Sequence, residues 1–187
     1  MKLAAIVLAA GAGTRFGGDK LAALFRGEPL IAHAIRAARA APVTQVIVVC
    51  PEQLDIGDWP GAPQVAALRI ASRELSASLK AGIAAVEGAE GAFVFLGDMP
   101  LIPHGLASKL AAALGSHFAA IPQFGAIFGH PVLLAARAFA EISRLHGDEG
   151  AGRLLKARND IAIVATGDEG VTLDIDRAED IVRLEKR

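Results

Sequence analysis

The sequence predicts an α/β protein, a single domain over residues 1–187 with a Rossmann-like, three-layer fold and a mostly parallel central sheet. Its 187 residues are the length of one domain. Hydrophobic residues make up 53% of the chain and charged residues 21%, which provides a large core and excludes a disordered chain. Short, almost continuously apolar runs alternate with segments of helical periodicity, as is typical of a parallel sheet covered by helices.

The apolar runs are the expected strands. They are residues 3–10, 45–50, 92–96, 117–121 and 161–165, a shorter strand at 65–68, and an extended segment or hairpin within 123–134. The first run has a second interpretation, as the apolar part of a secretory signal. We favour the strand because an intact glycine-rich motif follows the run directly, and the run is too short to span a bilayer.

Helices are expected between these strands. They are residues 29–40, 76–86, 105–114, 136–145, 150–157 and 177–185. In the first of them, Pro29 suits the first helical position, and Arg36 and Arg39 lie opposite an apolar face. Residues 52–64 contain several glycines and prolines and are expected to form an exposed excursion.

Composition and charge exclude several classes of partner. The formal net charge is −1 with 19 basic and 20 acidic residues, and the chain has no tyrosine and one tryptophan, so nucleic-acid binding is not expected. No membrane association is expected either. The single cysteine, Cys50, excludes an internal disulfide and a multi-thiolate metal site, and fits a reducing, cytoplasmic location. Cys50 itself is expected to be a core residue.

A glycine-rich segment after the first strand predicts a phosphate-binding loop. Residues 11–18 contain four glycines, whose backbone N–H groups can turn inward around an anion, and Arg15 and Lys20 add two cations. The loop would lie at the carboxyl end of a strand, where open α/β sheets bind ligands. A plain tight turn is the alternative. The Walker pattern fails at Leu21, and the dinucleotide fingerprint fails at Phe16.

Three aspartates are candidate ligands of a divalent metal ion, which prefers oxygen ligands. Asp98 follows a predicted central strand, although a turn aspartate would occupy the same place. Asp174 and Asp176 are two residues apart and share one face of an extended segment. Position favours Asp176 as the cap of the last helix and Asp174 as the ligand. Asp19 is expected to be exposed and paired with Lys20.

Two serines and one histidine have both a structural and a functional interpretation. Ser76 and Ser78 open a predicted helix, so they could cap it or contact a nucleotide. His130 lies between Gly129 and Pro131, which restricts the backbone and fixes the direction of the ring. It could be a structural hydrogen-bonding residue or face a substrate.

Residues 8–20, LAAGAGTRFGGDK, resemble the signature of the nucleotidylyltransferases with a MobA-like NTP-transferase domain, and most of all that of the molybdenum cofactor cytidylyltransferases. Further motifs follow in the family's order along essentially the whole chain. They are SASLKAG at 76–82, LGDMPL at 96–101, GHPV at 129–132, GDEG at 147–150 and LDID at 173–176 before Glu179 and Asp180. The chain departs from the family where Glu74-Leu75 replace a usual Gly-Met and Ala71-Ser72 an Asn-Pro.

The resemblance implies transfer of CMP from CTP to the terminal phosphate of molybdopterin or its molybdenum-loaded form, with release of pyrophosphate. Members with Ala at the position of Ala10 resemble CTP users, and those with Gly resemble GTP users. The implied nucleotide-binding residues are Leu8, Ala9, Ala10, Gly11, Gly13, Thr14, Arg15, Lys20, Ser76 and Ser78. Arg15, Lys20 and Asp98 are the implied catalytic residues, and Mg²⁺ is the implied cofactor, held by Asp98 with Asp174 or Asp176.

The same resemblance makes His130 an acceptor-binding residue, and a molybdoenzyme or its insertion chaperone a further partner. A phosphate monoester is mostly dianionic near neutral pH, with a second pKa of about 6, so it needs no general base to attack phosphorus. The alternatives are an enzyme of the same fold that uses GTP or a sugar or polyol phosphate, and a non-catalytic protein that delivers molybdenum cofactor.

Overall fold

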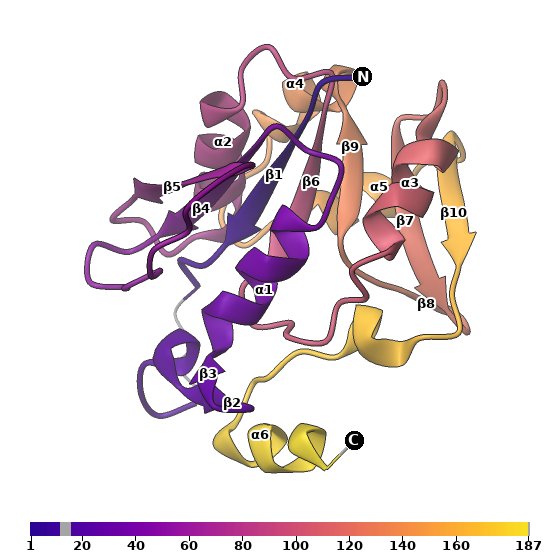
Figure 1. Ribbon diagram of the computed structural model, residues 1–187. Helices are drawn as coiled ribbons and strands as arrows, with labels where there is room; N and C mark the ends of the chain where they lie inside the picture. The colour runs from indigo at the N-terminus through magenta and orange to yellow at the C-terminus, as the bar shows by residue number, and fades with distance from the viewer. Residues whose placement is uncertain (12–15, 187) are drawn as a thin grey trace.

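A central sheet divides the protein into three layers, as the computed structural model of residues 1–11 and 16–186 shows (Figure 1). The strand order is β10-β7-β9-β6-β1-β4-β5, with β8 paired to β7. All pairs are parallel except those made by β9 and β8. The sheet strands are β1 (Leu3–Leu8), β4 (Gln45–Cys50), β5 (Gln64–Arg69), β6 (Gly91–Leu96), β7 (Ala119–Phe124), β8 (Ile127–Phe128), β9 (Val132–Ala135) and β10 (Ile161–Ala165). The predicted α/β class and mostly parallel sheet are confirmed.

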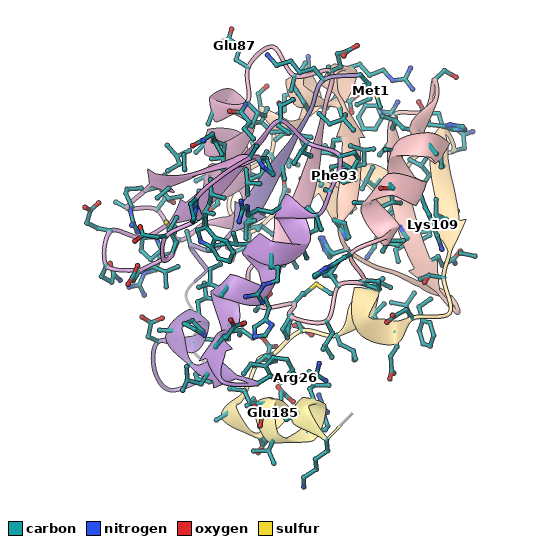
Figure 2. The ribbon with its side chains drawn as sticks, in the orientation of Figure 1. Met1, Arg26, Glu87, Phe93, Lys109 and Glu185 are labelled. Carbon is teal, nitrogen blue, oxygen red and sulfur yellow. The ribbon has the colours of Figure 1, made fainter. Side chains whose placement is uncertain are left out.

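Helices cover both faces of the sheet. Helices α1 (Leu30–Arg39) and α3 (Leu106–Leu114) lie on the face seen in front in Figure 1, and α2 (Leu75–Ala85), α4 (Phe139–Ile142) and α5 (Ala151–Lys156) lie behind it. Successive residues of β1 supply the two cores, because Ala5 and Val7 pack with α1 while Ala4 and Ile6 pack with α2. Phe93, labelled in Figure 2, is fully buried in the front core.

A small third core joins the last helix, α6 (Ala178–Glu185), to the hairpin of β2 (Leu24–Phe25) and β3 (Glu28–Pro29). Its buried members are Phe25, Leu30, Ile175 and Leu184. At its edge the backbone N–H of Arg26 donates to Glu185, 2.7 Å away, and the two residues lie together in Figure 2. The C-terminal segment is thereby fixed beside the chain that follows the glycine-rich loop.

Several predicted boundaries shift. The expected helix 136–145 is a 3-10 turn, η2 (Ala136–Ala138), followed by the short α4. Pro29 is the N-cap of α1 and not its first helical residue. The β2–β3 hairpin was not predicted, because each strand has two residues and its turn rests on positive φ angles at Arg26 (51°) and Gly27 (81°). No helix within the described residues is long and apolar enough to cross a membrane.

Candidate active site

The carboxyl ends of β1 and β6 are packed against each other. The N–H of Gly97 donates to the carbonyl of Leu8 (2.9 Å), and the N–H of Ala9 donates to that of Val49 (2.8 Å). A side chain at Gly97 would lie 3.0 Å from Ile31 and 3.2 Å from the Leu8 carbonyl oxygen, so glycine allows the close approach. This packing places Asp98 beside the start of the predicted phosphate loop.

Three aspartates meet at this edge. Asp98, Asp174 and Asp176 each offer a carboxylate oxygen, and these oxygens lie within 4.8 Å of one another. The intervening Ile175 is buried, and its N–H donates to the carbonyl of Asp98 (3.0 Å), which fixes the C-terminal segment to the end of β6. The two ligand candidates left open by the sequence therefore both reach the cluster.

Lys20, in the 3-10 turn η1 (Lys20–Ala22), lies inside this carboxylate cluster. Its Nζ is 2.7 Å from Asp98 Oδ2 and 3.4 Å from Asp176 Oδ1, and only 12% of the side chain is exposed. The expected pairing of Lys20 with Asp19 is wrong: Asp19 is exposed, and the lysine pairs across the tertiary structure instead.

The expected role of Asp176 as a helix cap is also wrong. Arg177 is the N-cap of α6, and the carboxylate of Asp180 accepts hydrogen bonds from the backbone N–H groups of Asp176 (3.0 Å) and Arg177 (2.8 Å). A carboxylate three residues into a helix can bind these N–H groups from inside the first turn. Asp180 therefore caps α6 and leaves the Asp176 side chain at the cluster.

The cluster lowers the acidity of Asp174. Partial removal from water, together with the charges of Asp176 and Asp98, raises the pKa of Asp174, and the nearby Lys20 ammonium opposes this rise. Asp174 is nevertheless exposed, so its carboxylate is open to a cation arriving from solvent.

His130 lines a cavity beside the carboxyl ends of β1 and β6. The cavity has a volume of about 380 Å³. Burial lowers the pKa of His130, which makes the ring neutral at pH 7. Its Nδ1 lies 3.4 Å from the carbonyl of Val94, and because a carbonyl only accepts, Nδ1 carries the hydrogen. The backbone N–H of His130 donates to the carbonyl oxygen of Val171 (2.8 Å). A Cβ at Gly129 would lie 2.3 Å from that Val171 oxygen, so glycine is needed there.

The cavity walls are apolar and its edge is cationic. Leu8 and Leu96 come from the strand ends, and Arg153 and Lys156 come from one face of α5. The remaining lining residues are Leu75, Leu79, Val94, Ile121, Phe128, Gly129, His130, Val132, Gly150, Ala151, Gly152 and Leu155. Neither Arg153 nor Lys156 was expected at the site from the sequence, although their spacing of three in a predicted helix was the available signal.

The two serines are buried at the start of α2. Neither caps the helix, because Glu74 is the N-cap, and the Ser78 hydroxyl donates to the Glu74 carbonyl (3.1 Å). The N–H of Ser76 donates to the carbonyl of Gly147 (3.0 Å), and Leu75 packs on Gly150. The structure thus brings the SASLKAG and GDEG motifs together beside the cavity.

Of the predicted loop residues, Ala9 and Ala10 are buried and Gly11 is exposed. Gly13, Thr14 and Arg15 lie outside the described residues.

Comparison with known proteins assigns the family. MobA-like NTP transferase domains match residues 5–162, and the chain belongs to this family of nucleotidyltransferases. It is 31% identical to the purine catabolism protein PucB of Bacillus subtilis (strain 168) over 197 residues, which cover 97% of this chain and 96% of PucB. It is 36% identical to the 2-C-methyl-D-erythritol 4-phosphate cytidylyltransferase of Cereibacter sphaeroides (strain KD131) over 134 residues, which cover 65% of this chain and 58% of the relative.

Solved structures agree with this assignment. Rv0371c of Mycobacterium tuberculosis H37Rv is 26% identical, with a TM-score of 0.82 and coverage of 100% of this chain and 98% of that chain. A complex of the same protein with manganese has a TM-score of 0.78 at 25% identity, with coverage of 100% and 99%.

Proposed function

We propose that this protein transfers CMP from CTP to the terminal phosphate of molybdopterin or the molybdenum cofactor, releasing pyrophosphate. The observation that carries the proposal is the convergence of Asp98, Asp174, Asp176 and Lys20 beside the start of the glycine-rich loop. Ala10 and the similarity to a protein named as a cytidylyltransferase support CTP as the donor. The acceptor rests on the resemblance of the motifs to molybdenum cofactor cytidylyltransferases.

The carboxylate cluster suits a hard divalent cation such as Mg²⁺, because its ligand atoms are all carboxylate oxygens. Asp98, Asp174 and Asp176 would hold the ion, and the manganese complex of Rv0371c supports a divalent metal. An ion held there would supply positive charge that offsets the negative charge on the α-phosphate and the leaving pyrophosphate.

The chain's own groups position the reactants. Lys20, Arg15 and the loop amides would hold the β- and γ-phosphates, and the neutral His130 with the cavity beside it would hold the acceptor. The acceptor phosphate is already an anion and attacks the α-phosphorus in line, so that a new P–O bond forms as the bond to pyrophosphate breaks. Catalysis on this scheme is positioning plus neutralisation of charge.

A pyrophosphate-release assay tests the proposal. Purified molybdenum cofactor is supplied with Mg²⁺ and, in turn, CTP, GTP, ATP or UTP. We expect release with CTP, and Asp98→Asn should lower the rate at least about a hundredfold because one metal-binding charge is lost. Release of pyrophosphate from GTP in preference to CTP would refute CTP as the donor. An unchanged Mg²⁺ dependence of the rate in Asp98→Asn would refute Asp98 as a metal ligand.

A polyol phosphate acceptor is the second candidate, favoured by the 36% identity to the methylerythritol phosphate cytidylyltransferase. The same assay with CTP and a polyol phosphate separates the two acceptors. Binding of molybdenum cofactor without release of pyrophosphate from any triphosphate would instead indicate a delivery protein.

A further inference from the structure

We propose that Lys20 has a role besides holding phosphates: in the absence of nucleotide its ammonium is the counter-ion of the carboxylate cluster and opposes the binding of a divalent metal ion. The metal would then bind more tightly together with the triphosphate than on its own. This inference rests on the proposed function in one respect, that the cluster is the metal site.

The geometry places the ammonium where it competes with a metal ion. Nζ contacts Asp98 at 2.7 Å and Asp176 at 3.4 Å, and both residues are among the three that could share a cation. The distance to Asp98 is that of a strong, charge-assisted hydrogen bond. With 12% of the Lys20 side chain and 23% of the Asp98 side chain exposed, water screens this pair only in part.

The charges of these side chains determine how strongly the ammonium opposes metal binding. Three carboxylates and one ammonium leave these four side chains with a net charge of −2 when all are ionised. Removing the ammonium would make the net charge −3. It would also remove a repulsive positive charge a few ångströms from an incoming cation. A divalent ion interacts with that charge twice as strongly as a monovalent ion does.

A triphosphate would relieve the competition. Lys20 directly follows the glycine-rich segment in the sequence, so an anion bound by that segment would offer the ammonium new oxygen partners. The carboxylates released by Lys20 are then available to the cation that accompanies the triphosphate. The same lysine thus favours the nucleotide-bound metal over free metal.

Binding of Mn²⁺ alone to the nucleotide-free full-length protein tests the inference, with free Mn²⁺ measured by electron paramagnetic resonance. Lys20→Met keeps the length of the side chain and removes its charge, and we expect it to bind Mn²⁺ at least about tenfold more tightly than the parent. Lys20→Arg keeps the charge and should match the parent. Lys109→Met, which removes an exposed lysine of α3, controls for net charge.

The outcomes separate the inference from the proposed function. Mn²⁺ binding by Lys20→Met that is unchanged or weaker, in a protein that binds Mn²⁺ and loses it in Asp98→Asn, overturns the counter-ion role and leaves the metal site standing. Equal tightening by Lys20→Met and Lys20→Arg overturns it too, because shape and not charge would be responsible. Absence of Mn²⁺ binding from the parent and all variants refutes the metal site, and the inference with it.

Discussion

Several residues of the candidate site are fixed by main-chain hydrogen bonds to distant parts of the chain. Asp98 and the Asp174–Asp176 segment are joined by the Ile175 N–H, and Asp180 fixes the backbone at Asp176. His130 is held through its own N–H by Val171. These backbone contacts with distant parts of the chain help to position Asp98, Asp176 and His130, whereas Lys20 is held through its side-chain ion pairs.

His130 gives a pH prediction at this scale. Because its pKa is lowered in the folded state, the unfolded chain binds the proton more tightly, and stability falls as the pH drops below the ordinary histidine value of about 6.5 towards the lowered pKa. His130→Asn removes this titration, so its free energy of unfolding should fall less between pH 7 and pH 5. The slope attributable to one histidine is at most about 1.4 kcal/mol per pH unit.

Urea unfolding at several pH values measures this difference. His104→Asn, at an exposed histidine, is the matched control and should follow the parent. A parallel pH dependence in the parent and His130→Asn would contradict the buried, neutral state of the ring.

At the scale of elements, the 3-10 turn η3 (Glu169–Thr172) connects the carboxylate cluster to His130. Its Val171 accepts the hydrogen bond from His130, and its Gly170 lies against the loop that follows Asp98. A side chain at Gly170 would lie 2.2 Å from the carbonyl oxygen of Leu101. The two sides of the site are thus held at a fixed spacing by one close backbone contact.

Gly170→Ala should destabilise the fold, because the clash is with rigid backbone. We expect a loss of about 1–3 kcal/mol in the free energy of unfolding, measured in urea. Gly167→Ala is the matched control, since nothing lies within 4 Å of its added carbon, and it should stay within about 0.5 kcal/mol of the parent. Equal stability of the two variants would show that η3 can move away from Leu101.

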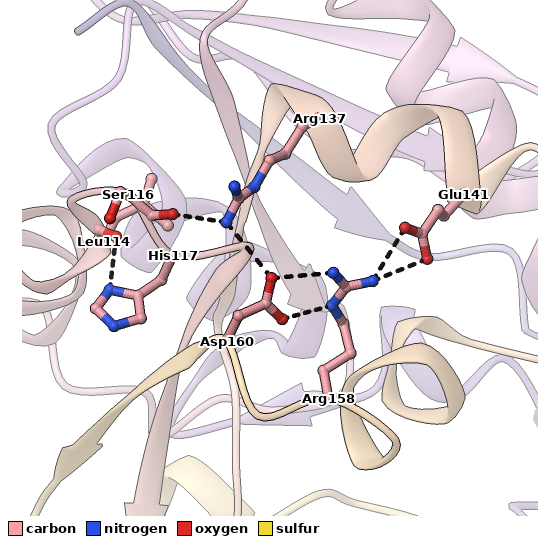
Figure 3. A network of polar contacts seen from close by, with 7 residues as sticks. All are labelled: Leu114, Ser116, His117, Arg137, Glu141, Arg158 and Asp160. Carbon is pink, nitrogen blue, oxygen red and sulfur yellow. Dashed lines mark hydrogen bonds and ion pairs between the residues drawn. The ribbon is translucent and has the colours of Figure 1, made fainter.

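At the scale of the whole molecule, the Arg158 network and the candidate site lie at opposite ends of the sheet. Arg158 donates two hydrogen bonds to Asp160 (2.7 and 3.0 Å) and two to Glu141 (3.0 and 3.2 Å), as Figure 3 shows. Its guanidinium carbon also lies 3.6 Å from the centre of the Phe118 ring. This network joins α4 to the amino ends of β7 and β10. The strands β7, β10 and β6 run in the same direction, so the carboxylate cluster, which follows the carboxyl end of β6, lies at the opposite end of the strands from this network.

Arg158→Lys should therefore lower the thermal unfolding midpoint without changing the affinity for Mn²⁺. Lysine keeps the charge but loses the paired geometry and the stacking on Phe118. Differential scanning calorimetry and the Mn²⁺ titration are read on the same sample. A loss of Mn²⁺ affinity would show that the two ends of the sheet are coupled.

The sequence by itself determined the α/β class and most strands and helices, because buried parallel strands are continuous apolar runs, and it indicated Asp98 at the carboxyl end of one of them. Lys20, Asp174 and Asp176 were expected from their spacing and from the family motifs. The tertiary structure alone decided that Lys20 pairs with Asp98 and not Asp19, that Asp180 caps α6, and that α5 gives two cations to a cavity. These depend on contacts between residues far apart in the chain, and local periodicity holds no information about which distant backbone groups come to lie together.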